Sequence, residues 1–199
     1  MTEPVILASA STARAALLRA AGVDFTIVPA QIDEAPLKHA AKRAGISATE
    51  CAIALAIEKA RYVSHRAPRA LVIGADQILA SGAEWLDKPG DLGDLGAQLQ
   101  SLRGRTHVLA TAVCVAHDGA VLWQATSAPE LTMRPFSDDF LSAYLAAEGE
   151  KLLGSVGGYQ LEGRGAQLFS RISGDYFAVL GLPLVELLGF LRERGAMLT

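Results

Sequence analysis

A carboxylate and an ammonium group follow an apolar stretch near the middle of the chain. The run Val72-Ile73-Gly74-Ala75 leads directly into Asp76, and Lys88 follows twelve residues later. A carboxylate from a buried strand and a cation from the next loop fit a site for an anionic, metal-bound substrate. The alternative is that Asp76 caps a turn and Lys88 is a solvated surface charge. Other segments must decide between these interpretations.

A second candidate is the turn Ser9-Ala10-Ser11-Thr12-Ala13-Arg14, between an apolar strand and a helix. The free N–H groups and the dipole of a helix N-terminus favour an anion, so Ser9 and Ser11 are candidate phosphate-binding residues. Arg14 adds a guanidinium that can bind a phosphate through two hydrogen bonds. The alternative is an ordinary N-cap followed by a surface arginine.

Further candidates are the acidic pair Asp33-Glu34 and Lys59. With Asp76, Glu34 supplies the oxygen ligands that Mg²⁺ or Mn²⁺ prefers, and Lys59 supplies a cation for phosphate oxygens. The alternatives are a solvated loop pair and a surface charge on a helix. A glycine-rich segment over residues 154–165 carries Glu162 and lacks the spacing of known phosphate-binding loops. Its glycines fit the close approach of a planar ligand or a bulged hairpin.

Length and composition predict one domain over residues 1–199, with two lobes around a cleft as an option. The chain is 51% hydrophobic, but no apolar run approaches the roughly 20 residues of a membrane span. The first residues lack the basic region and the long apolar core of a signal sequence, so a cytoplasmic location is the default expectation. The net charge of −3 argues against a nucleic acid partner. The two cysteines, Cys51 and Cys114, are interpreted as structural thiols.

Hydrophobic periodicity and capping residues predict strands alternating with helices, and therefore an α/β fold with a mixed sheet. The turn His117-Asp118-Gly119 predicts a β-hairpin. Residues 29–45 are predicted to be irregular. The expected strands cover residues 5–8, 25–28, 71–80, 106–116, 120–133 and 167–172, and the expected helices follow Ser11, Ser47, Asp91, Ser137 and Pro183.

Taken together, these segments resemble the Maf family of nucleoside triphosphate pyrophosphatases over nearly the whole chain. The matching motifs follow the family's order. They are Ile6-Leu7-Ala8-Ser9-Ala10-Ser11 with Arg14, Ile32-Asp33-Glu34, Glu58-Lys59-Ala60, Gly74-Ala75-Asp76, Lys88-Pro89, Leu102-Arg103-Gly104-Arg105-Thr106-His107, Gly163-Arg164-Gly165 and Gly181-Leu182-Pro183-Leu184.

The resemblance implies a Maf-type α/β fold, with a mixed twisted sheet flanked by helices and a deep nucleotide-binding cleft. It implies hydrolysis of a nucleoside triphosphate to its monophosphate and diphosphate, with a divalent metal, Mg²⁺ or Mn²⁺. Asp76 matches the family's proton acceptor, and the other matching active-site positions are Arg14, Glu34, Lys59 and Lys88. Glu34 and Asp76 are the expected metal ligands. Neither a membrane nor a nucleic acid partner is expected, and a homodimer is plausible.

The base-reading positions favour 7-methyl-GTP as the substrate. Gln77 and Glu162 look like the 7-methyl-GTP subgroup, and a carboxylate at Glu162 suits the positive charge of the 7-methylguanine ring. Ala13 matches neither the arginine of the pyrimidine-preferring members nor the aromatic residue of the 7-methyl-GTP subgroup. Gly174-Asp175-Tyr176 looks like the pyrimidine-preferring members. A pyrophosphatase acting on dTTP and UTP therefore stays an alternative.

A second alternative comes from another functional class. Maf proteins are also associated with inhibition of septum formation, so the chain could be a nucleotide-binding regulator of cell division. The presence of Asp76, Lys59 and Lys88 favours catalysis. His107 has two interpretations, an approach to the substrate or a structural hydrogen bond at the start of a strand.

Overall fold

The computed structural model describes residues 3–198, and the chain divides into two compact units. The predicted single domain stays a prediction. No helix in the described part of the chain is long and apolar enough to span a membrane. Unit 1 contains the described residues of Met1–Gln77, Ala110–Ser127 and Asp175–Thr199, and unit 2 contains Ile78–Leu109 and Ala128–Gly174.

Unit 1 is built on a mixed β-sheet with the strand order β2-β1-β3-β5, and β6 pairs with β5. β1 (Val5–Leu7) lies parallel to β2 (Thr26–Ile27) and to β3 (Leu71–Ser81). β5 (Thr106–His117) runs antiparallel to β6 (Ala120–Ser127). The mixed sheet with its flanking helices confirms the predicted α/β fold class.

The predicted hairpin is confirmed at the turn between β5 and β6. Asp118 and Gly119 both have positive φ angles, 47° and 77°. Two left-handed central residues are typical of the tight turns that match the twist of paired strands. The Asp118 carboxylate also accepts a hydrogen bond from the N–H of Arg69, at 3.0 Å. The turn is therefore tied to the loop before β3.

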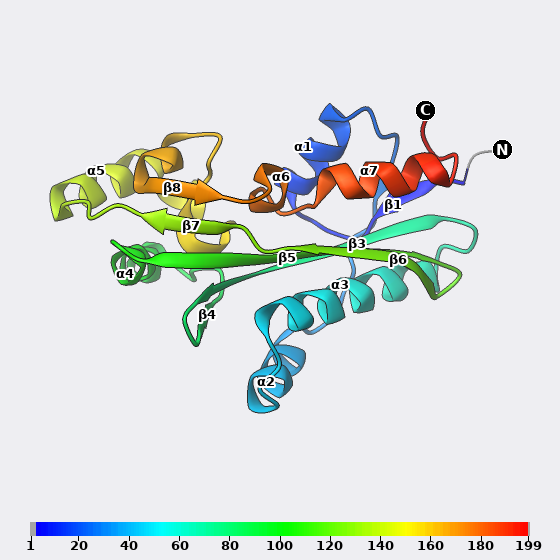
Figure 1. The fold of residues 1–199 in the computed structure, drawn as a ribbon, viewed down its shortest axis with the longest axis horizontal. Coiled ribbons are helices and arrows are strands. Elements are labelled where there is room, and N and C mark those ends of the chain that lie inside the picture. Colours follow the sequence, from blue (N-terminus) through cyan, green and yellow to red (C-terminus); the bar gives the residue numbers. More distant parts are fainter. Residues whose placement is uncertain (1–2, 199) are drawn as a thin grey trace. The chain divides into compact units, whose positions relative to one another are not determined.

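Helices cover both faces of the unit 1 sheet (Figure 1). α1 (Thr12–Ala20) and α7 (Leu184–Glu193) lie on one face, and α3 (Ala48–Ser64) lies on the other. α6 (Tyr176–Val179) is a short helix before α7. The core on the α1 and α7 face includes Leu7, Leu18, Ile73, Val113 and Leu187, and a smaller cluster toward α3 contains Ile6, Val63 and Val72.

α3 begins with the capping box that its sequence predicts. The Ser47 hydroxyl accepts a hydrogen bond from the N–H of Glu50, and the Glu50 carboxylate accepts one from the N–H of Ser47. These reciprocal bonds satisfy two N–H groups that a helix start would otherwise leave without partners. The cap therefore fixes where the helix begins, and with it which side chains face the sheet.

Gly74 lets α3 lie unusually close to β3. A Cβ atom at this position would collide with the carbonyl oxygen of Ala56 and would lie 2.7 Å from the backbone nitrogen of Ala60. Both obstacles are on the helix backbone, which cannot rotate away as a side chain can. The glycine is therefore needed for contact between helix and strand, two residues before Asp76.

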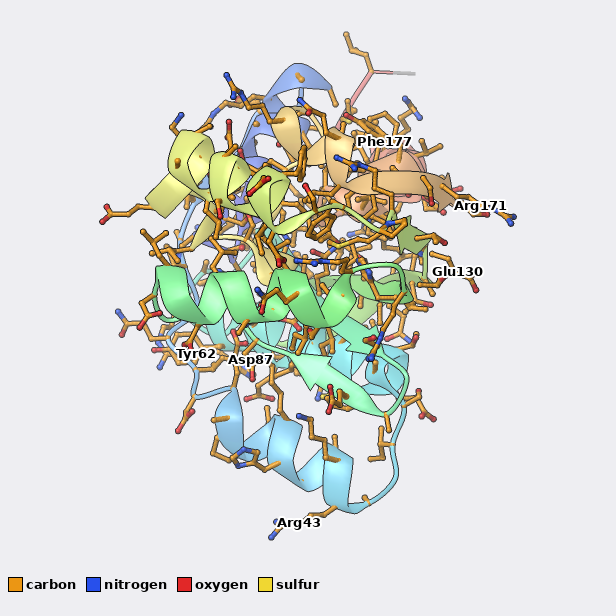
Figure 2. All side chains as sticks on the ribbon, turned by 90° about the vertical axis from the view of Figure 1, so that its left-hand side faces the viewer. Arg43, Tyr62, Asp87, Glu130, Arg171 and Phe177 are labelled. Carbon is orange, nitrogen blue, oxygen red and sulfur yellow. The ribbon has the colours of Figure 1, made fainter. Side chains whose placement is uncertain are left out.

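The prediction that residues 29–45 are irregular was wrong in part. α2 (Ala35–Arg43) forms within them and lies against α3. Pro36 is in the first turn, where its fixed φ favours a helix, and Gly45 follows the helix with φ 68°. Only Ala41 of α2 is buried, so the apolar period that would reveal the helix is weak. Arg43 points away from the rest of the unit (Figure 2).

Unit 2 contains antiparallel strand pairs. β4 (Glu84–Leu86) pairs with the end of β3. β7 (Glu130–Met133) pairs with the start of β5 and with β8 (Phe169–Ser173). The prediction of one continuous strand over residues 120–133 was wrong, because the segment forms two strands, β6 and β7, on either side of Pro129. Proline has no N–H to donate and fixes φ, so it interrupts a strand.

The helices of unit 2 agree with the prediction, and short helical turns surround the glycine-rich segment. α4 (Leu92–Leu102) and α5 (Asp138–Glu148) begin at the expected caps, Asp91 and Ser137. Three 3₁₀ turns follow, η1 (Gly149–Leu152), η2 (Val156–Gly158) and η3 (Arg164–Leu168).

His107 is buried inside unit 2 and has the structural role that was one of its two interpretations. It is 1% exposed, and its Nε2 lies 2.6 Å from the hydroxyl of Tyr159. Its Nδ1 is buried and has no hydrogen-bond partner among the described residues. Burial lowers the pKa of His107 to about 4, since a charged ring would be poorly solvated here. The imidazole is therefore neutral near pH 7.

Replacing Gly74 with alanine should destabilise the protein, because the new methyl group pushes α3 away from β3. Overpacking of this kind costs about 1–3 kcal/mol of unfolding free energy. Gly189→Ala in α7 is the matched control, since a Cβ there meets nothing within 4 Å and alanine favours a helix. Urea denaturation measures both variants. A Gly74→Ala variant as stable as Gly189→Ala would contradict the close approach.

His107 should make stability fall with acidification. The unfolded histidine titrates near pH 6.5 and the native one near 4, so between these values the unfolded state binds a proton that the native state does not. Stability therefore drops as pH falls through this window, by roughly 3 kcal/mol in full. Urea denaturation from pH 7.5 to 4 should show a steeper loss for the wild type than for His107→Gln. Equal pH slopes would contradict the assignment.

Candidate active site

The predicted turn between β1 and α1 places its polar groups at the carboxyl end of β1. The Ser9 hydroxyl oxygen accepts a hydrogen bond from the N–H of Ser11, and the Ser11 hydroxyl oxygen caps α1 by accepting one from the N–H of Arg14. Ser9 is 8% exposed, while Ala13 is only partly buried. The first N–H groups of α1 have no partner within the helix, so this end favours an anion.

Arg14 is held in place by three hydrogen bonds. Its Nε donates to the carbonyl oxygen of Gly181 at 2.8 Å, and its Nη1 donates to Ser9 Oγ at 3.1 Å and to the carbonyl oxygen of Ala75 at 3.0 Å. Burial lowers the pKa of the guanidinium, while the charges of Asp76 and Glu34 oppose that shift. Arginine stays charged in proteins even so. Arg14 is thus a fixed cation that interacts electrostatically with both carboxylates.

Lys59 joins the two carboxylates that the sequence analysis singled out. Its Nζ lies 2.5 Å from Asp76 Oδ1 and 2.7 Å from Glu34 Oε1. Asp76 and Lys59 are buried, at 4% and 9% exposure, whereas the Glu34 side chain is 36% exposed. An ammonium between two carboxylates compensates charges that could not otherwise be taken out of water. Residues from the loop before α2, from α3 and from β3 therefore form one charged cluster.

The two carboxylates of this cluster differ in environment. Burial would raise the pKa of Glu34, but the charge and hydrogen bond of Lys59, assisted by Lys38 at 3.6 Å, lower it below its ordinary value. Glu34 is therefore ionised near neutral pH. Asp76 Oδ2 is buried and has no hydrogen-bond partner among the described residues. A buried acceptor without a partner is costly unless a ligand supplies one.

The donor set fits a divalent cation of the magnesium type. Asp76 Oδ2 is an available oxygen, and Glu34 contacts the same lysine as Asp76, Lys59. Within residues 3–198 there is no group of three acidic, histidine or cysteine side chains that could hold a metal alone. Mg²⁺ commonly takes one or two carboxylates and completes its shell with substrate phosphates and water. The neighbouring Asp33 caps the N–H of Ala35 instead, at 3.2 Å.

Comparison with known proteins identifies the family of this chain. A profile of the family described as "Maf-like protein" matches residues 4–194. The chain belongs to the Maf family. It is 52% identical to a protein of Granulibacter bethesdensis named nucleoside triphosphate pyrophosphatase, over 97% of this chain and 98% of the relative. It is 47% identical to a protein of Rhizobium etli named 7-methyl-GTP pyrophosphatase, over 99% of both chains.

Gln77 of this Maf chain lies next to Asp76 on β3, and its side chain is bound within unit 1. Its Nε2 donates to Thr111 Oγ1 at 2.8 Å and to the carbonyl oxygens of Ala178 and Val179 at 2.9 and 3.2 Å. Successive side chains of a strand point to opposite faces. Gln77 accordingly contacts α6, while Asp76 contacts Lys59 of α3.

Lys88 and Glu162, the two remaining predicted site residues, belong to unit 2. Both are exposed, Lys88 between β4 and α4 and Glu162 between η2 and η3. The turn that carries Glu162 is tight, because a Cβ at Gly165 would lie 2.7 Å from the nitrogen of Gln160. The glycines near Glu162 therefore close a compact loop. The roles of Lys88 and Glu162 in the site stay predictions.

Sequence reasoning missed the groups that hold the predicted residues in place. The carbonyl oxygens of Ala75 and Gly181 bind Arg14, and Thr111 binds Gln77. Backbone carbonyls leave no residue-type signal, and only the Gly181-Leu182-Pro183 motif pointed to that segment. Cys51 is buried, and burial, with the charge of Asp76, raises the pKa of its thiol, as expected for a structural cysteine.

Replacing Lys59 with methionine should destabilise the protein strongly and raise the pKa of Glu34. The variant removes the ammonium that contacts the buried Asp76, and breaking a buried pair costs about 3–5 kcal/mol of unfolding free energy. Lys38→Met is the control, because Lys38 lies 3.6 Å from the more exposed Glu34, farther than Lys59 does. Urea denaturation gives the stabilities, and carboxyl carbon-13 NMR gives the Glu34 pKa. Equal effects of the two variants would show that Lys59 does not bridge the carboxylates.

Proposed function

We propose that this chain hydrolyses a nucleoside triphosphate to the monophosphate and diphosphate. The observation that carries the proposal is the buried Asp76, whose Oδ1 contacts Lys59 while its Oδ2 has no hydrogen-bond partner among the described residues. A purely structural ion pair would be expected to satisfy both oxygens. The names of the two relatives, at 52% and 47% identity over nearly the whole chain, support the same reaction.

In this proposal, Asp76 Oδ2 accepts a proton from the water that attacks the α-phosphorus. The new P–O bond forms on the α-phosphorus, the bond to the bridging oxygen breaks, and diphosphate leaves. The hydrogen bond from Lys59 keeps Oδ1 occupied and so directs Oδ2 toward the water. The N-terminus of α1 and the fixed charge of Arg14 bind phosphate oxygens. Lys88 stays the further cation that the sequence predicts for the phosphates.

Glu34 is the residue that would hold a divalent cation, Mg²⁺ or Mn²⁺, and Asp76, the second predicted ligand, is committed in this proposal to the water through Oδ2. When bound, such an ion offsets negative charge on the phosphates and on the leaving diphosphate. Glu34 suits this role because its pKa lies below the ordinary value, so that it is ionised at neutral pH. Because its side chain is about one-third exposed, Glu34 can also exchange Lys59 for another cation more readily than the buried Asp76 can.

For the base, the proposal favours 7-methyl-GTP, with a pyrimidine nucleotide as the alternative. The Rhizobium etli relative carries that substrate in its name. Glu162 is an exposed carboxylate on a tight loop, and a negative side chain suits a purine ring with positive charge. Ala13 places no cation at the start of α1, and a cation there would repel such a positively charged ring.

The deciding assay is diphosphate release from 7-methyl-GTP, GTP, UTP and dTTP. Asp76→Asn should lower kcat by about 10²- to 10⁴-fold, the usual contribution of a general base. Asp33→Asn is the control, because Asp33 caps a backbone N–H and does not contact Lys59. Chelation should abolish turnover, and added Mg²⁺ or Mn²⁺ should restore it.

Each result of this assay has a distinct meaning. Preference for 7-methyl-GTP would support the proposed substrate. Preference for UTP and dTTP would retain the reaction and overturn the substrate. No diphosphate from any nucleotide, together with retained nucleotide binding, would overturn the enzyme and favour a nucleotide-binding regulator.

A further inference from the structure

Lys38 brings a second ammonium group to Glu34. Its Nζ lies 3.6 Å from Glu34 Oε2, while the Nζ of Lys59 lies 2.7 Å from Oε1. Each oxygen of the Glu34 carboxylate therefore faces a cation. The interaction at Oε2 is the weaker of the two, because a separation of 3.6 Å is too long for a good hydrogen bond.

The backbone of α2 delivers Lys38 to this carboxylate. Glu34 is the N-cap of α2, and its carbonyl oxygen accepts a hydrogen bond from the N–H of Lys38 at 3.0 Å. Side chains four residues apart lie on the same side of a helix, and glutamate before lysine is the favourable order. Because residues 29–45 were expected to be irregular, the proximity of Lys38 to Glu34 was not predicted.

The side chain of Lys38 is more shielded than that of a typical surface lysine. It is 21% exposed, against 36% for Glu34, although only Ala41 of α2 is buried. A fully exposed pair at this spacing would contribute little beyond a small stabilisation of the helix. The ammonium of Lys38 instead lies beside the residue that the proposed function assigns to the metal.

Lys38 and a divalent cation would compete for the same oxygen. A cation on Glu34 adds positive charge next to the ammonium that faces Oε2, and like charges at short distance repel. Of the two lysines on Glu34, Lys38 is the easier to displace. Lys59 also contacts the buried Asp76, and that pair would be costly to break.

A lysine displaced from Oε2 has a new partner close by. Mg²⁺ commonly completes its shell with substrate phosphates, so the phosphates lie beside the carboxylate that holds the metal. Lysine carries a compact charge on a flexible four-carbon chain, and it can follow such a partner without movement of the backbone. The ammonium of Lys38, which starts 3.6 Å from the same carboxylate, therefore has phosphate oxygens within its reach.

We infer that Lys38 is a further phosphate-binding residue of this site, and that it competes with the metal for Glu34. Before a divalent cation binds, Lys38 offsets the charge of Oε2. When the cation takes that oxygen, Lys38 moves to the phosphates of the substrate and of the diphosphate product. The inference rests on the proposed function for its substrate. A lysine that only stabilised α2 would affect neither metal binding nor diphosphate binding.

The first test measures Mn²⁺ binding without nucleotide, from the electron paramagnetic resonance signal of the free ion. Lys38→Met keeps the length of the side chain and removes the competing charge. Mn²⁺ should then bind about two- to fivefold more tightly, the factor that an exposed ion pair contributes. Arg43→Met is the matched control, because it removes a positive charge from the same helix at a side chain that points away from the rest of the unit (Figure 2). Its Mn²⁺ affinity should equal that of the wild type.

The second test measures the affinity for inorganic diphosphate by calorimetry. Saturating Mn²⁺ is present, so that a change in metal affinity does not enter the result. Lys38→Met should bind diphosphate about tenfold more weakly, or worse, because it lacks one hydrogen bond between charged groups. The KM values of 7-methyl-GTP, GTP and UTP should rise by a similar factor, since the phosphates are common to all three. Lys38→Arg keeps the charge and should restore most of the affinity, and Arg43→Met should bind as the wild type does.

The opposite signs of the two effects distinguish this role from a structural one. Tighter Mn²⁺ binding together with weaker diphosphate binding in Lys38→Met would support the inference. Unchanged binding of either ligand, or equal changes in Lys38→Met and Arg43→Met, would overturn it. Lys38→Gln gives the same comparison if the methionine variant folds poorly.

Neither binding measurement requires turnover, so the inference and the proposed function can fail separately. If the wild type cleaves no nucleotide, the proposed function fails, and the Mn²⁺ and diphosphate affinities still decide the role of Lys38. If the wild type cleaves nucleotides and Lys38→Met binds both ligands as the wild type does, the proposed function stands and the inference is overturned. A wild type that binds no diphosphate would also overturn the inference.

Discussion

The charged cluster around Lys59 is the interaction on which the site depends. Asp76 is almost fully buried, and a carboxylate charge is costly to bury without a cation in contact. The cation comes from α3, and α3 reaches β3 only because Gly74 has no side chain at the contact. The absence of a side chain at Gly74 is therefore needed for the ion pair as well, since displacing α3 would separate the ammonium of Lys59 from the carboxylate of Asp76.

Side chains alternate between the two faces of β3, and the polar residues on each face have different partners. Asp76 contacts Lys59 on the α3 side, and Gln77 contacts α6 on the other. The register of β3 is set by parallel pairing with β1, Leu7 being opposite Ile73. A slip of one residue would exchange the two faces, burying the amide against Lys59. The apolar residues before Asp76, alternating between two cores, therefore select the face on which the carboxylate is presented.

The sequence predicted elements with strong local signals and missed those without them. The capping box of α3 and the Asp-Gly turn between β5 and β6 are local hydrogen-bonding patterns, and both were predicted. α2 buries a single residue and α6 spans one turn, so neither has a period to detect. Within the site, residue types identified Glu34, Lys59 and Asp76. The contacts among them join segments far apart in sequence, so the sequence alone could not establish them. The protein partners of Gln77 are mostly backbone carbonyls, which no residue type reveals.

The unequal burial of the two carboxylates explains how one lysine can serve both a folded resting site and a reaction. Asp76 is bound tightly, because releasing its ammonium would leave a buried charge uncompensated. Glu34 is about one-third exposed and can exchange the ammonium for water or another cation at a much lower cost. Arrival of a metal-bound triphosphate would therefore loosen the contact between Lys59 and Glu34 before the contact between Lys59 and Asp76. Lys59 would then keep Asp76 oriented, while the remaining ammonium hydrogens of Lys59 donate to phosphate oxygens. The buried pair of Lys59 and Asp76 would thus stay intact while Lys59 exchanges Glu34 for the phosphates.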